Sequence, residues 1–201
     1  MMQSTDQGAL YRLRLARKDI GVAVVVLLAL ALGWLLRMQV ESRTRQFAEE
    51  GAAFSITYPA TWNATDTLQD ALLKISDPLT ASSFKTNLTI ERRDADPASP
   101  LDLQTLLDRR VEQHGALTGY HFLNNSDATV GGVHSSSIDY AYVVQPIDQP
   151  RRPSLPVVVQ AREYIVAAAG RTYYITLAAP AEDFDAARTQ FERMIQTVKI
   201  Q

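Results

Sequence analysis

The 201-residue chain contains no cysteine. This absence excludes a disulfide framework, a thiolate nucleophile and a cysteine-based zinc site. Histidine is also scarce, because the chain has only His114, His121 and His134, and these lack the close spacing of metal ligands. We therefore expect each histidine to have a structural role, and we expect no metal and no cofactor.

Motifs that support catalysis are missing as well. The sequence has no glycine-rich phosphate loop and no Gly-x-Ser-x-Gly nucleophile elbow. His134 is followed by three serines. However, neighbouring residues of a strand point to opposite faces, and a catalytic triad depends on geometry rather than on adjacency. The sequence therefore predicts that the protein is not an enzyme, and a hydrolase ranks below the binding functions considered below.

Basic side chains are few in the larger part of the chain. Residues 1–46 carry seven basic and three acidic side chains, whereas residues 47–201 carry thirteen basic and nineteen acidic ones. The adjacent arginines Arg92-Arg93 and Arg109-Arg110 are isolated pairs, which we interpret as solvated. An acidic domain without a basic cluster binds nucleic acid poorly, because phosphate neutralisation dominates such affinity. The sequence therefore predicts no nucleic-acid partner.

One long apolar run is present near the N-terminus. From Ile20 to Leu36, 17 consecutive residues carry no charged side chain. As a helix this run covers about 25 Å, close to the lower limit for a hydrocarbon core of about 30 Å. Trp34 lies near one end, where interfacial aromatic residues are common. We therefore predict a transmembrane helix over residues 20–36, with Ile20, Leu27, Leu28, Trp34 and Leu36 in the lipid bilayer.

The sequence disfavours two alternatives to a membrane anchor. A buried core helix is disfavoured because the run has no polar stripe. Ala29-Leu30-Ala31 resembles a signal-peptide cleavage site, but the apolar run continues past it and exceeds the usual signal core of about 7–15 residues. We therefore expect an uncleaved signal anchor in the cell membrane. More basic side chains precede the run than follow it, so residues 1–19 are predicted to form a short cytoplasmic tail.

The residues after the span are predicted to lie outside the cytoplasm. Residues 37–50 are rich in charge and are interpreted as a helical or linker stalk, and residues 51–201 have the size of one domain. We expect Ser99-Pro100 to begin a helix, Gly115 to end it and Pro180 to open a second helix. Alternating apolar side chains predict strands over residues 54–58, 71–76 and 84–93, on both sides of Gly131-Gly132, and on both sides of Gly170-Arg171.

The predicted order of elements is β-β-β-α-β-β-β-β-α. This order favours an α+β fold in which an antiparallel sheet is packed against helices. The proline-rich residues 145–156 are predicted to be an exposed connection between strands.

Two parts of this domain resemble a known family. The stretch FSITYPATWNA at residues 54–64 is similar to the opening strand and corner of PsbP-like domains, and residues 171–200 are similar to their last strand and terminal helix. The resemblance implies an α/β/α sandwich around an antiparallel sheet. It also implies a mostly non-enzymatic interaction or assembly module, as in extrinsic photosystem subunits and bacterial lipoproteins. Because the family has no shared catalytic motif, the resemblance assigns no site residue.

Tyrosines are concentrated on the predicted strands. Tyr140, Tyr142 and Tyr164 are candidates for an interaction surface, with core packing as the alternative because aromatic side chains favour half-buried sheets. We predict a membrane-anchored, extracytoplasmic protein-interaction module whose partners are the lipid bilayer and a membrane protein complex, which it serves as an accessory or assembly subunit. A domain that binds a small ligand or a lipid is the alternative.

Overall fold

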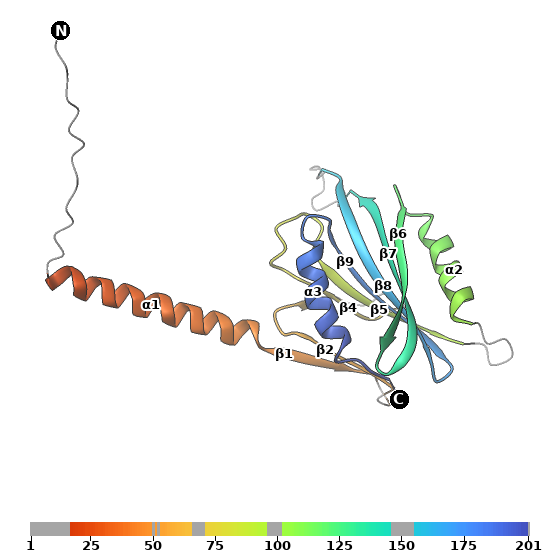
Figure 1. Ribbon diagram of the computed structural model, residues 1–201, viewed down its shortest axis with the longest axis horizontal. Coiled ribbons are helices and arrows are strands. Elements are labelled where there is room, and N and C mark those ends of the chain that lie inside the picture. Colours follow the sequence, from red (N-terminus) through yellow and green to blue (C-terminus); the bar gives the residue numbers. More distant parts are fainter. Residues whose placement is uncertain are drawn as a thin grey trace, which may run out of the picture. The chain divides into compact units, whose positions relative to one another are not determined.

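The computed structural model describes residues 17–49, 51, 53–65, 71–95, 102–145 and 155–200. The chain divides into two compact units between Ser42 and Arg43. Each unit is described by itself, starting with the helix that forms the first (Figure 1).

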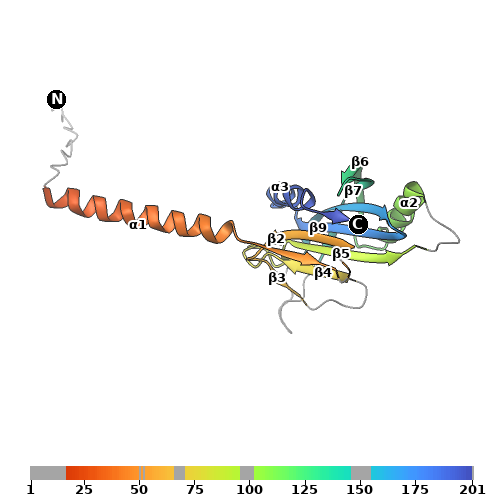
Figure 2. The same cartoon turned by 90° about the horizontal axis from the view of Figure 1, so that it is seen from below.

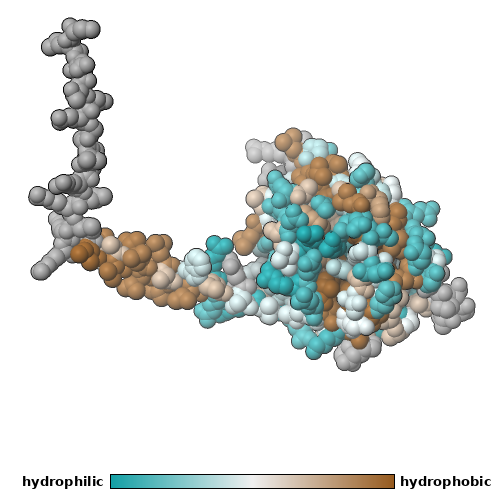
Figure 3. Space-filling view, in the orientation of Figure 1, coloured by the Kyte–Doolittle hydropathy of each residue, from teal (hydrophilic) through white to brown (hydrophobic). Residues whose placement is uncertain are grey.

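Helix α1 spans Arg17–Glu41 and contains the predicted apolar run. Its segment Ile20–Gln39 is 20 residues long, apolar and unburied, so α1 is long and apolar enough to cross a membrane. The space-filling view shows this apolar surface in brown (Figure 3). The five side chains predicted to lie in lipid are all exposed on α1: Ile20, Leu27, Leu28, Trp34 and Leu36. The helix therefore fits a membrane anchor or a signal sequence.

The second unit begins with a strand instead of a stalk. Residues Thr44–Ala48 form β1, which pairs antiparallel with β2 at Phe54–Pro59. The interpretation of residues 37–50 as a helical or linker stalk is therefore wrong beyond the end of α1. Phe47 is the only large apolar side chain in β1, so the sequence lacks the alternation that marks a strand, and pairing with β2 supplies the structure instead.

Two antiparallel sheets form the second unit. The smaller sheet has the order β1-β2-β10, and the larger has the order β3-β4-β5-β9-β8-β7-β6. The two-residue strands β3 and β10 are too short to leave a periodic pattern in the sequence, and they were not predicted. The remaining strands have these bounds: β3 Asn63–Ala64, β4 Ala71–Ser76, β5 Asn87–Asp94, β6 His121–Val130, β7 Val133–Val144, β8 Val157–Ala168, β9 Arg171–Pro180 and β10 Lys199–Ile200.

The larger sheet lies between two layers (Figure 2). Helix α2, Leu103–His114, packs Leu106 and Leu107 in one buried cluster with Ile138 of β7. Helix α3, Phe184–Ile195, and the smaller sheet share a second cluster with β4, β5 and β9. In that second cluster, the ring of Phe54 stacks on Tyr173 with centroids 4.9 Å apart. The predicted α+β sandwich, with an antiparallel sheet between helices, is confirmed.

The turn and cap residues agree with the sequence patterns only in part. Gly131 and Gly132 form the predicted β6–β7 hairpin and both have positive φ, at 59° and 83°. The β8–β9 turn uses Ala169 and Gly170, one residue earlier than predicted. Helix α2 begins after its N-cap Asp102, whose carboxylate accepts a hydrogen bond from the Thr105 backbone N–H at 2.9 Å.

Some expected features lie outside the described residues. These are the predicted helix start at Ser99-Pro100, most of the tail over residues 1–19, and residues 146–154 of the proline-rich connection. Gly115 does follow α2, but its φ of −56° is right-handed, so the backbone does not require glycine there.

Candidate functional site

A fully buried carboxylate, Glu163, lies in the middle of β8. Strand side chains alternate between faces, so Glu163 points to the same face as Ala161 and Ile165, toward α2. Arg110 Nε donates to Glu163 Oε1 at 2.6 Å, and His114 Nε2 lies 2.6 Å from Glu163 Oε2. Because Arg110 and His114 are four residues apart on α2, both reach the same carboxylate.

Arg110 is held by further contacts. Its Nη2 lies 3.3 Å from Glu91 Oε2 on β5, and its guanidinium lies 4.5 Å from the ring centroid of Tyr174 on β9. Burial lowers the pKa of Arg110, but the neighbouring carboxylates of Glu163 and Glu91 more than offset this effect and leave the pKa raised. Arg110 therefore stays cationic and links α2 to three strands.

Aromatic rings cover the other side of the buried carboxylate. His114 stacks on Tyr140 with centroids 4.3 Å apart, and Tyr140 lies 5.8 Å from Tyr120 and 5.9 Å from Tyr142. Burial raises the pKa of Tyr140 well above its usual value and that of Tyr142 to about 12. These tyrosines therefore stay neutral, and His114 lies between the Glu163 carboxylate and the Tyr140 ring.

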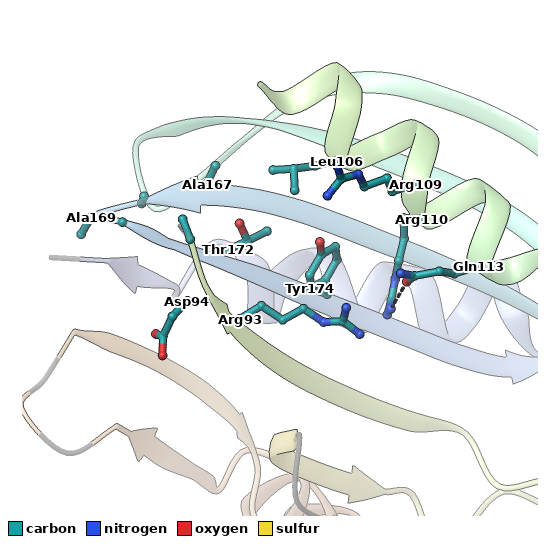
Figure 4. A pocket seen from close by; sticks show the side chains of 13 residues that line it. Arg93, Asp94, Leu106, Arg109, Arg110, Gln113, Ala167, Ala169, Thr172 and Tyr174 are labelled. Carbon is teal, nitrogen blue, oxygen red and sulfur yellow. Dashed lines mark hydrogen bonds between the residues drawn. The ribbon is translucent and has the colours of Figure 1, made fainter. Parts of the chain in front are cut away.

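A cavity of about 650 Å³ lies beside this network, between α2 and the β8–β9 hairpin (Figure 4). Arg93 and Tyr174 enter it from neighbouring strands, and Arg109 enters it from α2. The Arg93 guanidinium lies 5.8 Å from the Tyr174 ring centroid. The cavity is also lined by small and apolar residues and by a few polar or charged ones: Leu106, Ala167, Ala168, Ala169, Gly170 and Thr172, together with Asp94, Ala95, Arg110 and Gln113. The cavity is therefore positively charged, with an aromatic and alanine-rich wall.

The arginine pairs differ from their sequence interpretation. Arg110 is buried and Arg92 forms an ion pair with the buried Glu49, so neither is simply solvated. Each of these arginines contacts a carboxylate that is distant in the sequence, Glu49 or Glu163, so the neighbouring residues do not reveal the contact. Within the described ranges, no three His, Asp or Glu side chains come together in a way that could hold a metal ion. The arrangement is suited to holding an anionic or planar group.

The three candidate tyrosines do not form one surface. Tyr140 is only 3% exposed and faces α2, and Tyr142, two residues further along β7, faces the same side. Tyr164 faces the opposite layer, where its ring lies 5.6 Å from Phe191 of α3. The prediction of a shared tyrosine surface is therefore corrected. Tyr140 pairs with Ala161 across the β7–β8 ladder, so these two side chains lie on the same face of the sheet. Tyr164 lies three residues after Ala161 on β8 and therefore points to the opposite face.

Comparison with known proteins gives structural matches alone. No protein-family model and no curated protein matches the sequence. Cyanobacterial PsbP (CyanoP) from Synechocystis sp. PCC 6803 is similar with a TM-score of 0.56 and 10% identity, covering 79% of this chain and 92% of that one. LpqN of Mycobacterium tuberculosis, which is involved in cell envelope biogenesis, is similar with a TM-score of 0.57 and 11% identity, covering 79% and 91%.

A protein of unknown function from Pseudomonas aeruginosa is also similar, with a TM-score of 0.50 and 14% identity over 78% of this chain and 96% of that one. At these identities the matches show fold and not activity. They confirm the resemblance seen in residues 54–64 and 171–200. The chain therefore has the PsbP-like fold, an antiparallel sheet between helices, preceded by an apolar helix that could span a membrane.

Proposed function

We propose that the protein is a non-catalytic interaction module, anchored by α1 in the cell membrane, whose folded unit lies outside the cytoplasm. The observation that carries this proposal is the 20-residue exposed apolar segment Ile20–Gln39, followed directly by a PsbP-like folded unit. The similarity to LpqN, which is involved in cell envelope biogenesis, supports a place in the envelope. The module would serve as an accessory or assembly subunit of a membrane complex.

The absence of cysteine makes the orientation directly testable. Single cysteines would be introduced at Ser4, before α1, and at the exposed Ala186 on α3. In intact cells, a membrane-impermeant maleimide is expected to label the A186C variant, and to label the S4C variant only after the membrane is permeabilised. Labelling of S4C but not A186C in intact cells would reverse the proposed orientation, and the unmodified chain is the blank.

Strand β6 offers a surface for a partner. It is one of the two outer strands of the larger sheet, and within the described chain β7 is its only strand neighbour. An edge strand carries backbone N–H and C=O groups that another chain can pair with, and lysine or proline often blocks such pairing. Residues 121–130 contain neither lysine nor proline. Phe122 and Leu123 on this strand are 40% and 45% exposed.

The surroundings of β6 define the chemistry of the partner. A hollow of about 420 Å³ between α2 and β6 is lined by Leu107, Val111 and Phe122 together with the carboxylates Asp108 and Glu112. The pairing of β6 with β7 is irregular between Phe122 and Asn124. We therefore expect a partner strand to pair regularly with β6 from Asn124 onward. We propose that an extended partner segment with apolar and basic side chains adds to this edge.

Replacing both Phe122 and Leu123 with lysine is expected to abolish recovery of the partner. Two cations would remove the apolar contact and repel a basic segment. The measurement is co-purification from native membranes in mild detergent, with circular dichroism to verify the fold. The control is L79K, because Leu79 is 79% exposed on the loop after β4. Equal recovery with F122K/L123K would contradict the β6 surface, and recovery of a lone monomer from the wild type would contradict the interaction function.

A further inference from the structure

We propose that the cavity between α2 and the β8–β9 hairpin binds a small molecule that carries a phosphate group and a planar or apolar portion. Arg93 and Arg109 would donate to the anion, and Tyr174 with the alanine wall would contact the rest. This inference does not depend on the interaction function proposed above, because the cavity and the β6 edge use different residues.

Among the described residues, two of the three arginines that line the cavity are not paired with a carboxylate. Arg110 is matched by Glu163 and Glu91. Arg93 and Arg109 form no ion pair with any residue in the described part of the chain, although both line the same hollow. Two guanidiniums facing one space favour an anion and disfavour a metal cation, because each offers a planar set of N–H donors that matches phosphate oxygens.

The remaining carboxylate at the cavity is engaged elsewhere. Asp94 lines one edge, and its Oδ1 lies 3.8 Å from Arg92 Nε and 3.7 Å from Arg171 Nε. It is also largely solvated, which weakens its effect on other charges. Asp94 therefore does not neutralise Arg93 and Arg109.

The aromatic wall is held in place before any ligand arrives. The Tyr174 ring has the Arg110 guanidinium 4.5 Å and the Arg93 guanidinium 5.8 Å from its centroid. Arg110 is fixed by the fully buried Glu163, and Gln113 Oε1 accepts from Arg110 Nη1 at 3.3 Å. Figure 4 shows Arg93 lying along Tyr174 with its guanidinium directed toward Arg110. A site with fixed groups loses less entropy when it binds.

The size and wall of the cavity suit a small organic anion. Its volume of about 650 Å³ falls within the range of about 300–1,000 Å³ that is typical of small-molecule sites. Ala167, Ala168 and Ala169 leave room along one wall, and Leu106 adds apolar surface. A free phosphate ester and a phospholipid headgroup share this chemistry, so the experiment must separate the two sources.

The test uses the full-length protein in neutral nanodiscs, with phenyl phosphate as the soluble probe. Calorimetry is expected to show saturable binding that R93Q/R109Q weakens roughly tenfold to a hundredfold, because charge-assisted hydrogen bonds are lost. The matched control is R193Q, which removes an exposed arginine from α3 and should bind like the wild type. Thermal melting of each variant verifies that the fold is intact.

A second arm tests the headgroup source. Nanodiscs that contain phosphatidylglycerol are expected to lower the affinity for phenyl phosphate if lipid occupies the cavity, and to leave it unchanged if the ligand is a soluble ester. The proposal is overturned if R93Q/R109Q binds phenyl phosphate as tightly as R193Q. It is also overturned if the wild type shows no saturable binding of phenyl phosphate in neutral nanodiscs at millimolar concentration.

Discussion

Replacing Glu163 with leucine is expected to destabilise the folded unit by about 3–5 kcal/mol. The change leaves Arg110 buried with Glu91, 3.3 Å away, as its remaining carboxylate partner and takes the carboxylate away from His114. Removing one member of a buried ion pair is costly because the remaining charge is not solvated. Since the free energy of unfolding of a whole domain is about 5–15 kcal/mol, this single change is expected to remove a large share of it.

Urea unfolding of the full-length chain in detergent, followed by circular dichroism, measures this loss. The variant E163Q keeps the shape of the side chain and one hydrogen-bond acceptor, so its free energy of unfolding is expected to fall less than that of E163L. Glu192 gives the matched control, because it pairs with Arg162 at 3.1 Å but its side chain is 47% exposed. E192L is expected to cost under about 1 kcal/mol. If E163L and E192L unfold at the same urea concentration, the buried network does not stabilise the fold as described.

Removing both charges of the Arg110–Glu163 pair separates the effect of charge on stability from the effect of packing. The double variant E163L/R110M is expected to recover part of the stability lost in E163L, because no uncompensated guanidinium remains in the layer. A double variant less stable than E163L would show instead that Arg110 stabilises the layer mainly through packing on Tyr174.

Placing two arginines in the middle of α1 is expected to release the protein from membranes. Each arginine at the centre of a transmembrane helix costs about 2.5–3.5 kcal/mol for insertion, so L27R/L28R should oppose insertion by several kcal/mol. Both side chains are exposed on α1. The measurement is the fraction of full-length chain that stays with carbonate-washed membranes.

The control for this experiment is L27A/L28A, which keeps an uncharged helix and is expected to stay in the membrane fraction. Retention of L27R/L28R at the level of this control would mean that another part of the protein holds it to the membrane. Release of the wild type in the same wash would exclude α1 as a stable anchor.

Long periodic patterns made much of the fold predictable. The apolar run of α1, the glycine pair at residues 131–132 and the spaced apolar residues of α3 each imply one local structure. Strand β1 could not be found in this way because its only large apolar side chain is Phe47. Its structure comes from pairing with β2, which no local pattern reveals.

The candidate site leaves a weak signal in the sequence. Along β8, the residues facing α2 are Val159, Ala161, Glu163 and Ile165, so one carboxylate interrupts an apolar register. Such an interruption indicates a buried ionic contact. Its partners Arg110 and His114 could not be assigned, because the docking of α2 on β8 depends on the whole sheet. The opposite orientations of Tyr140 and Tyr164 depend on strand register in the same way.

The smaller sheet has a consequence for the order in which the protein folds. The Thr57 N–H of β2 donates to Thr197 Oγ1 at 2.9 Å, although these residues are 140 positions apart in the chain. Strand β2 pairs with β10 in the same region, so this sheet cannot be completed until residues 199–200 have left the ribosome. Contacts between such distant segments form slowly. During synthesis, Phe54 and Ile56 of β2 therefore stay exposed until β9 and α3, which share their buried cluster, have been made. A chaperone would be most useful to the nascent chain in this interval.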